Sequence, residues 1–366
     1  MIDVYPNTAA ERDRWILSHR PARNMVDPRR PFAFKLEEER TETGEIVPVA
    51  TIFLANRECP WRCLMCDLWR NTLTDPVPIG AIPAQIDSAL SELHARGCES
   101  TADTTAVSGA HRFQYSGRGL RSAATPSRQV KLYNSGSFFD PRAIPLEDYA
   151  AIAERVRAFS RVIVECHPAL VGGRCLRFRD LLAAGEQHHS SQPKLEVAMG
   201  LETAHPGVLE KLNKRMTLDD FQRAADYLRK NDIALRVFIL VKPPFLAEGE
   251  ALEWAHRSID FAFDCGATVA SLIPTRIGNG ALEALAARGE FSPPKLASLE
   301  TALDYGIGLR RGRVFADWWD LQQFSECSAC FEARRRRLQE MNLNQVAMPA
   351  VDCDRCQSHG GRRHPV

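Results

Sequence analysis

The sequence predicts an α/β protein, a partial (β/α)6 TIM-like barrel followed by a small metal-binding C-terminal module. One observation is a series of six short runs rich in Val, Ile, Leu and Phe, as expected of strands buried on both faces. Another is that helical patterns separate these runs, which favours right-handed βαβ units and a parallel sheet. A third is a pair of C-x2-C motifs near the C-terminus, which predicts the metal-binding module.

The predicted strands follow one another from residue 51 to residue 273, namely at 51–55, 130–134, 161–165, 195–199, 234–241 and 268–273. Helical patterns lie between them, with an apolar stripe at 149–159, a capping box at 217–220 and an amphipathic stretch at 250–263. The whole span is about 200 residues, close to the lower limit of a full eight-unit barrel, so a partial barrel of six units fits better.

The predicted organisation has three parts. Residues 1–50 are an N-terminal extension, 51–291 the barrel core, and 292–366 a C-terminal module that begins after a Ser-Pro-Pro break. Within the core, 99–128 is polar and rich in Ser, Thr, Gly and Arg. Structureless loops of this length are uncommon in compact domains, so a disordered insertion and a lid over the substrate are the two interpretations.

Composition excludes several classes of protein. The 366 residues are 45% hydrophobic and 25% charged, as in ordinary globular proteins. With 47 Lys+Arg against 46 Asp+Glu, the net charge of +1 gives no overall attraction to nucleic acid or to an acidic membrane. The N-terminus lacks the apolar core of a signal peptide, and no apolar run approaches the roughly 20 residues that span a bilayer. We therefore expect a cytoplasmic protein with reduced thiols and no membrane contact.

Three of the eleven cysteines lie close together directly after the first predicted strand. Cys59, Cys63 and Cys66 form C-x3-C-x2-C at the carboxyl end of that strand, where parallel α/β folds place their sites. Ordinary electron-transfer clusters use four protein thiolates, so three would leave one iron open to a substrate or cofactor. A zinc site completed by a distant ligand and an ordinary four-thiolate cluster are the alternatives.

This loop resembles the signature of the radical SAM superfamily. The resemblance implies that Cys59, Cys63 and Cys66 hold a [4Fe-4S] cluster, whose fourth iron binds S-adenosylmethionine. It further implies reductive cleavage to a 5′-deoxyadenosyl radical, which abstracts hydrogen from a substrate. A partial barrel of the radical SAM type and a reductant such as flavodoxin or ferredoxin follow from the same resemblance.

The resemblance also implies positions for the cofactor. Asn134, Ser135, Gly136 and Ser137 follow the second predicted strand, where the family has a Gly-Gly-Glu-like turn that contacts the methionine amino group. The glutamate is missing here, so we expect backbone groups to make that contact. Glu165 ends the third predicted strand, where related enzymes place a polar residue near the cofactor. A plain turn, and a capping or salt-bridged glutamate, are the alternatives.

A second stretch, 199–221, is similar to the elongator-type and coproporphyrinogen-oxidase-type radical SAM families. In those families a strand ends in Gly-x-Glu/Gln-Ser/Thr and is followed by a helix and a basic-x-Thr turn. The likeness implies that Glu202 faces the mouth of the cofactor or substrate site and that Arg215 neutralises its carboxylate. The substrate does not follow from the sequence, and modification of tRNA or another RNA is one expectation.

The C-terminal cysteines form two C-x2-C pairs, Cys327 with Cys330 and Cys353 with Cys356, separated by 22 residues. This spacing predicts a tetrahedral thiolate site, with zinc expected first and an auxiliary iron–sulfur cluster as the rival. The module is expected to fold only with its metal.

Between these pairs runs a series of four arginines, 334–337. A solvated helix face and contacts to RNA phosphates are both open interpretations. Trp318, Trp319 and Phe324 are more typical of core packing than of base stacking. Among the histidines, only His167 lies beside the expected site. The alternative function is a non-catalytic, zinc-stapled nucleic-acid-binding protein on a degenerate barrel.

Overall fold

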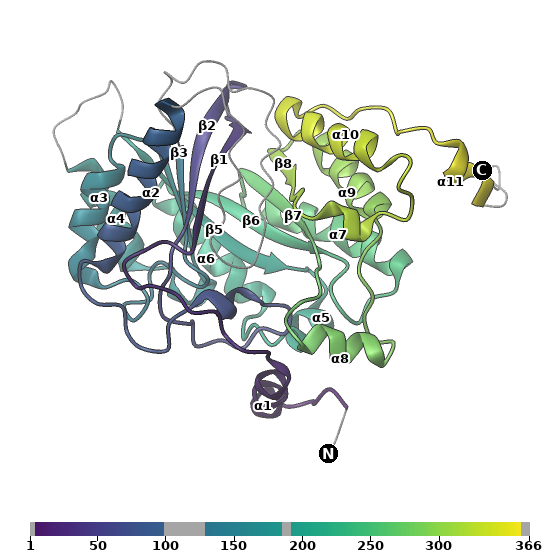
Figure 1. Cartoon of the computed structure of the whole chain (residues 1–366), viewed down its shortest axis with the longest axis horizontal. Coiled ribbons are helices and arrows are strands. Elements are labelled where there is room, and N and C mark those ends of the chain that lie inside the picture. The colour runs from purple at the N-terminus through teal and green to yellow at the C-terminus, as the bar shows by residue number, and fades with distance from the viewer. Residues whose placement is uncertain (1–3, 99–128, 185–191, 360–366) are drawn as a thin grey trace.

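One curled sheet forms the centre of the chain (Figure 1). The computed structural model describes residues 4–98, 129–184 and 192–359 of the 366-residue chain. Within these residues the sheet has eight strands, and their order in the sheet is their order in the sequence. They are β1 Ala33–Arg40, β2 Ile46–Phe53, β3 Gln129–Tyr133, β4 Arg161–Glu165, β5 Lys194–Glu202, β6 Ala234–Val241, β7 Val269–Pro274 and β8 Arg313–Ala316.

Strands β2 to β8 are parallel neighbours, and β1 pairs with β2 in the antiparallel sense. The predicted α/β fold class, a partial barrel, is therefore confirmed, and each of the six predicted runs overlaps one of the strands β2 to β7. The sequence did not indicate β1 or β8. Strand β8 has only four residues, and β1 carries charged residues at five of its eight positions.

Helices follow the strands and cover the outer face of the sheet (Figure 1). They are α2 Ala81–Cys98, α3 Tyr149–Val156, α4 Gly173–Ala183, α6 Leu218–Lys230, α7 Glu248–Asp264 and α9 Leu296–Gly308. The predicted capping box at the start of α6 is confirmed, because Thr217 accepts from the backbone N–H of Asp220 and the Asp220 carboxylate accepts from that of Thr217. In the part of the chain that the structure describes, no helix is long and apolar enough to cross a bilayer.

The remaining helices lie at the ends of the sheet or after it. They are α1 Ala9–His19, α5 Pro206–Lys211, α8 Ala281–Ala287, α10 Phe331–Asn344 and α11 Asp354–His359. Strand β1 lies within the predicted N-terminal extension, and both α9 and β8 lie within the predicted C-terminal module. The sheet thus extends beyond the predicted core of 51–291 at both ends. The predicted polar insertion, 99–128, falls outside the described residues.

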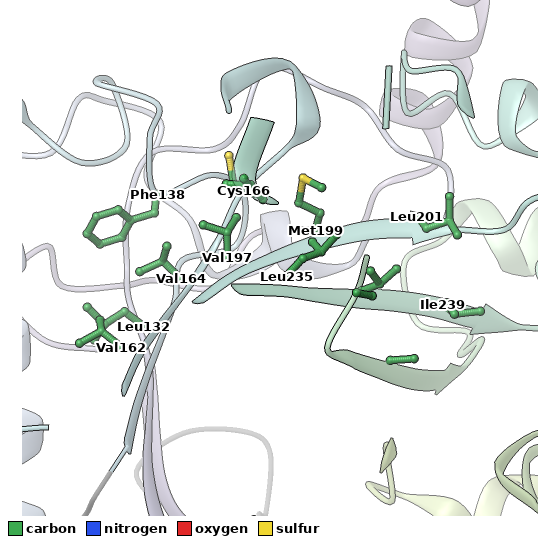
Figure 2. Close-up of a cluster of buried hydrophobic side chains, with 14 of the residues drawn as sticks. Leu132, Phe138, Val162, Val164, Cys166, Val197, Met199, Leu201, Leu235 and Ile239 are labelled. Atoms are coloured by element: carbon green, nitrogen blue, oxygen red, sulfur yellow. The ribbon is translucent and has the colours of Figure 1, made fainter. Parts of the chain in front are cut away.

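The main core fills the space between the sheet and the outer helices. Outward-facing side chains of β3 to β6, such as Leu132, Val164, Val197 and Ile239, pack together and are fully buried (Figure 2). At about 25 cal/mol per Å² of apolar area removed from water, this layer is the main favourable contribution to folding. It also explains why the β-rich runs were visible in the sequence.

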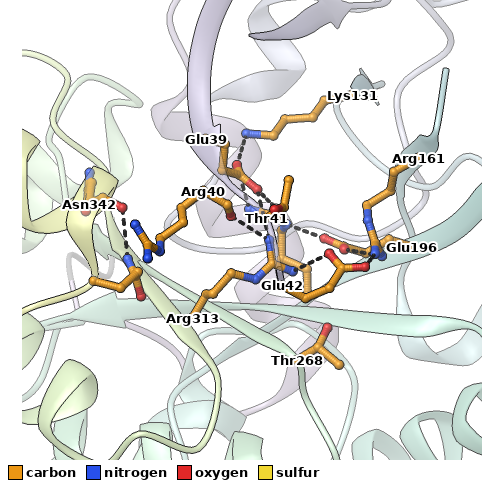
Figure 3. A network of polar contacts seen from close by, with 12 residues as sticks. Glu39, Arg40, Thr41, Glu42, Lys131, Arg161, Glu196, Thr268, Arg313 and Asn342 are labelled. Carbon is orange, nitrogen blue, oxygen red and sulfur yellow. Dashed lines mark hydrogen bonds and ion pairs between the residues drawn. The ribbon is translucent and has the colours of Figure 1, made fainter. Parts of the chain in front are cut away.

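The inner face of the sheet is charged at the amino ends of the strands (Figure 3). Glu39 of β1 accepts from Lys131 at 2.6 Å, and Glu196 accepts from Arg236 at 2.7 Å and Arg161 at 3.1 Å. Buried charges are tolerated when paired in this way. The many charged residues of β1 are therefore explained by its position, because the inner face of this strand contributes to an ion network instead of an apolar core.

Candidate active site

The C-x3-C-x2-C loop lies directly after β2, at the carboxyl edge of the sheet. Two other segments hold backbone groups of the loop. In the first segment, the carbonyl of Leu212 accepts from the amide of Leu64 at 2.9 Å, and the side-chain amide of Asn213 donates to the carbonyl of Arg62 at 2.8 Å. In the second segment, the side-chain amide of Asn279 donates to the carbonyl of Leu64 at 2.7 Å. The loop is therefore held in place by segments distant in sequence.

Glu58, next to the first cysteine, anchors the N-terminal segment to this loop. Its carboxylate pairs with Arg20 at 2.7 Å, with Arg62 at 3.0 Å and with Arg23. Burial opposes ionisation, but the hydrogen bonds from Arg20 and Arg23 hold the pKa of Glu58 below its usual range. The chain after α1 thus closes over the cysteine loop.

The three cysteines are partly buried free thiols. Burial raises the pKa of all three, that of Cys63 to about 12. A nucleophilic cysteine needs the opposite environment, one that lowers the thiol pKa. A bound metal, in contrast, supplies the charge that turns a buried thiol into a thiolate ligand.

The turn after β3 lies directly against the first cysteine. A β-carbon on Gly136 would come within 2.9 Å of the Cβ of Cys59, so only glycine allows this approach. Asn134 is fully buried, and both polar atoms of its side chain lack a partner within the described residues. A buried amide without partners indicates a binding site, because leaving it unpaired is costly.

Glu165, at the end of β4, binds this same turn. Its carboxylate accepts a hydrogen bond from the backbone N–H of Asn134 at 3.0 Å. Burial raises the pKa of Glu165 to about 7, although the backbone N–H groups of residues 134–136 work in the opposite direction. The structure therefore brings Asn134, Ser135, Gly136 and Glu165 together beside Cys59.

Ser137 contacts the segment that follows β4. Its hydroxyl accepts from the backbone N–H of His167 at 3.2 Å and lies 3.5 Å from the Sγ of Cys166.

Glu202 ends β5 and pairs with a buried lysine, Lys214. The expectation that Arg215 neutralises this carboxylate is wrong, because the Arg215 guanidinium pairs with Asp13 at 2.7 Å. Asn213 and Arg215 have φ values of +56° and +59°, a left-handed turn that directs the lysine inward and the arginine outward. Burial lowers the pKa of Lys214, but Glu202 and Cys63 outweigh it and raise the pKa above the usual value.

The C-terminal cysteines form a tight group. The Sγ atoms of Cys327 and Cys353 are 3.9 Å apart, those of Cys330 and Cys356 are 3.7 Å apart, and all four lie within 4.8 Å of one another. A tetrahedral ion with metal–sulfur bonds of about 2.3 Å places neighbouring sulfurs about 3.8 Å apart. The group is therefore able to hold a single metal ion.

The arginine run between these pairs is partly used inside the protein. Arg334 of α10 pairs with Glu300 at 2.9 Å, and Arg337 pairs with Asp304 at 2.7 Å, both on α9. These two side chains attach α10 to α9, so they are neither a solvated face nor free for phosphates. Of the three nearby aromatic residues, Phe324 is buried in the core and Trp318 packs against it.

Helix α10 also covers the free edge of β8. The side-chain amide of Asn342 makes two hydrogen bonds of 2.8 Å with the backbone N–H and C=O of Ala316. Gln345 does the same with Val314, at 2.7 and 2.8 Å. The two amides thus occupy the positions that another strand would take.

A curled α/β half-barrel with a three-cysteine loop after its first parallel strand defines a fold of the radical SAM type, as predicted. No family model matches the chain. Within this class, the stretches 131–139, 200–203 and 241–245 resemble in particular the radical SAM subunit of archaeosine synthase.

Sequence comparison confirms this predicted resemblance. The chain is 27% identical over 258 residues to archaeosine synthase subunit beta of Methanosarcina acetivorans, a match that covers 68% of this chain and 64% of the relative. It is 33% identical over 174 residues to the protein of the same name from Thermococcus kodakarensis, covering 46% of this chain and 51% of the relative. The matches thus span less than two thirds of either relative's length.

Among solved structures, the archaeal Elp3 of Methanocaldococcus infernus is similar with a TM-score of 0.46 and 13% identity. The similarity covers 71% of this chain and 59% of Elp3.

Proposed function

We propose that this protein is a radical SAM enzyme, in which Cys59, Cys63 and Cys66 hold a [4Fe-4S] cluster that binds S-adenosylmethionine. The observation that carries the proposal is the contact between the three-cysteine loop and the turn after β3, where Gly136 lies against Cys59. Bound together, cluster and cofactor supply reductive cleavage to a 5′-deoxyadenosyl radical, which takes hydrogen from the substrate.

The residues around the loop fit this cofactor. The Asn134 side chain offers a donor and an acceptor that have no partner among the described residues. Glu165 sits on the backbone of the same turn, and the Lys214 ammonium lies near Cys63 and Cys66. We assign Asn134, Ser135, Gly136 and Glu165 to the methionine and ribose portions and Lys214 to the carboxylate.

Glu202 and Ser137 are proposed to hold the cofactor-binding residues in position. Glu202 holds Lys214, and a β-carbon on Gly200 would collide with both of these side chains, so glycine permits the pair. Ser137 connects the turn to the backbone of His167.

The N-terminal segment is proposed to exclude water from the reaction. The Tyr5 hydroxyl donates to the carbonyl of Lys211 at 2.5 Å, and Arg20 and Arg23 bind Glu58 beside Cys59. Closing a site over reactive species prevents side reactions with solvent.

The second metal in this proposal is a single zinc ion on Cys327, Cys330, Cys353 and Cys356. Sulfur separations of 3.7 and 3.9 Å support one tetrahedral ion, since a four-iron cube carries each thiolate on a separate iron and spreads the sulfurs farther apart. The rival, an auxiliary iron–sulfur cluster, is the less favoured alternative.

The proposed substrate is an RNA nucleoside, in tRNA. The names of both relatives, archaeosine synthase subunit beta, support this substrate class. A flavodoxin or ferredoxin is the proposed source of electrons. The internal use of Arg334 and Arg337 argues against the arginine run as the main contact to RNA phosphates.

The test begins with anaerobic reconstitution with iron and sulfide, followed by addition of S-adenosylmethionine and dithionite. We expect about four irons in the first site and formation of 5′-deoxyadenosine. Cys59→Ala should abolish iron binding at the first site and formation of 5′-deoxyadenosine. Cys265→Ala, which changes a buried cysteine on the outer side of the barrel, should leave both unchanged. Equal amounts of 5′-deoxyadenosine from wild type and Cys59→Ala would refute the proposal. Zinc without iron, and RNA binding that weakens steeply with salt, would favour the non-catalytic alternative.

A further inference from the structure

Three loops at the carboxyl edge of the sheet meet at one residue, His167, two residues after the end of β4. Its ring stacks on Trp61 of the cysteine loop, with ring centroids 3.8 Å apart and planes inclined by 10°. Its Nε2 lies 2.9 Å from the carbonyl oxygen of Lys214. Its backbone N–H donates to the hydroxyl of Ser137 at 3.2 Å. Each of these partners belongs to a different loop around the proposed cofactor site.

The hydrogen bonds define the protonation of the ring. The backbone N–H of Ala169 donates to Nδ1 at 3.1 Å, so Nδ1 is the acceptor. The proton therefore sits on Nε2, which donates to the carbonyl of Lys214. Burial, with a contribution from the Lys214 ammonium, lowers the pKa of His167 to about 3, so the ring is neutral at physiological pH.

Only a histidine side chain supplies both the stacking on Trp61 and the two hydrogen bonds at its ring nitrogens. A phenylalanine has the flat face that stacks on Trp61 but no donor or acceptor at its edge. A glutamine has both polar groups but no ring to stack. The imidazole combines a face for the cysteine loop with one nitrogen for the Lys214 turn and a second nitrogen for the backbone of its own segment at Ala169.

We propose that His167 is a positioning residue for the cofactor site, holding the cysteine loop and the Lys214 turn in fixed relation to the turn at 134–137. The inference rests on the proposed function, since it concerns how that cofactor is held. Supporting residues of this kind matter because displacing a binding group by about 1 Å is enough to weaken catalysis strongly.

Two variants separate the two kinds of contact. His167→Phe keeps the stacking on Trp61 and loses the hydrogen bond to Lys214, and His167→Gln keeps a donor and loses the stacking. We expect both to assemble the cluster with wild-type iron content. S-adenosylmethionine should bind about tenfold more weakly, as when supporting partners of a metal site are changed. In each variant KM for S-adenosylmethionine should rise more than kcat falls.

The readout that does not depend on turnover is electron paramagnetic resonance of the reduced cluster. We expect the spectral change on addition of S-adenosylmethionine to be reduced or altered in both variants. The matched control is His256→Phe, since His256 of α7 also stacks on an aromatic ring, Tyr305 of α9, with centroids 3.9 Å apart. It lies on the outer helices, so its response should be that of the wild type.

The outcomes distinguish this inference from the proposed function. Wild-type cofactor affinity and a wild-type spectral response in the folded His167 variants would overturn the role of His167 and leave the proposed function intact. If His167→Phe does not fold, His167→Gln alone decides, by the same criteria. A wild-type protein with no cluster and no response to S-adenosylmethionine would overturn both.

Discussion

Gly136 and Cys59 approach each other so closely that a β-carbon on the glycine would lie 2.9 Å from the Cβ of the cysteine. Two loops from neighbouring strands, β2 and β3, therefore meet at a position where no larger residue fits without movement. This contact joins the proposed cluster ligand to the turn proposed to bind S-adenosylmethionine.

The first prediction concerns this contact. Gly136→Ala should push the turn at 134–137 away from Cys59, and 5′-deoxyadenosine formation should fall by at least about tenfold, since misplaced binding groups cost this much or more. Gly249→Ala is the matched control, because a β-carbon on Gly249 meets nothing within 4 Å. Product analysis of both reconstituted variants tests the prediction, and equal activity would contradict it.

The second prediction concerns the buried pair of Glu202 and Lys214. Lys214→Met leaves the Glu202 carboxylate buried without its partner, and the free energy of unfolding should fall by about 3 kcal/mol. Arg215→Gln, which removes a partly exposed pair with Asp13, should cost less than about 1 kcal/mol. Urea denaturation of the two variants measures the difference, and similar losses in free energy of unfolding would contradict the larger contribution assigned to the buried pair.

The third prediction is a pH dependence caused by Glu165. Burial raises the pKa of Glu165 in the folded protein to about 7, above its ordinary value of 4.5, so the folded state binds more protons between these values. Stability contributed by the protonated carboxyl is thus present below about pH 4.5 and is lost as the pH rises towards 7, by at most about 3 kcal/mol. Glu165→Gln stays neutral and lacks this loss.

The measurement compares wild type and Glu165→Gln, both without S-adenosylmethionine, at pH 5 and pH 8. The wild type should lose stability relative to the variant as the pH rises. A constant difference between the two proteins would show that Glu165 does not titrate in this range.

The fourth prediction concerns the C-terminal metal. Elemental analysis should find about one zinc ion per chain in addition to iron, and Co²⁺ substitution should give the absorption of a tetrahedral thiolate site. Cys353→Ser should lose the zinc, while Cys265→Ser should keep it. Iron and sulfide at this site, retained in Cys59→Ala, would instead identify an auxiliary cluster.

Much of the fold could be predicted because its signals are local. Strands β2 to β7 are rich in apolar residues, and the spacing of Cys59, Cys63 and Cys66 is visible within eight residues. Strand β1 was missed because its inner face carries the charged residues Lys35, Glu37 and Glu39. These side chains form ion pairs with one another or with Lys131 of β3, which the sequence does not reveal.

The contacts that the sequence did not reveal at the site depend on residues distant in the chain or on backbone angles, and neither leaves a local pattern. Because Asn213 and Arg215 have positive φ values, Lys214 and not Arg215 pairs with Glu202. His167 was noticed for its place beside the expected site, but its contacts with Trp61 and Lys214 come from loops that no sequence spacing relates.

The amides of Asn342 and Gln345 against β8 have a consequence for how the protein behaves in solution. An uncovered strand edge is a template for pairing with another chain, and these two side chains cover the β8 edge from the C-terminal end of α10, whose N-cap is Cys330. A metal on the C-terminal cysteines, as proposed above, would therefore stabilise the helix that covers this edge and so oppose aggregation. Chelation should therefore produce insoluble protein with added intermolecular β-structure.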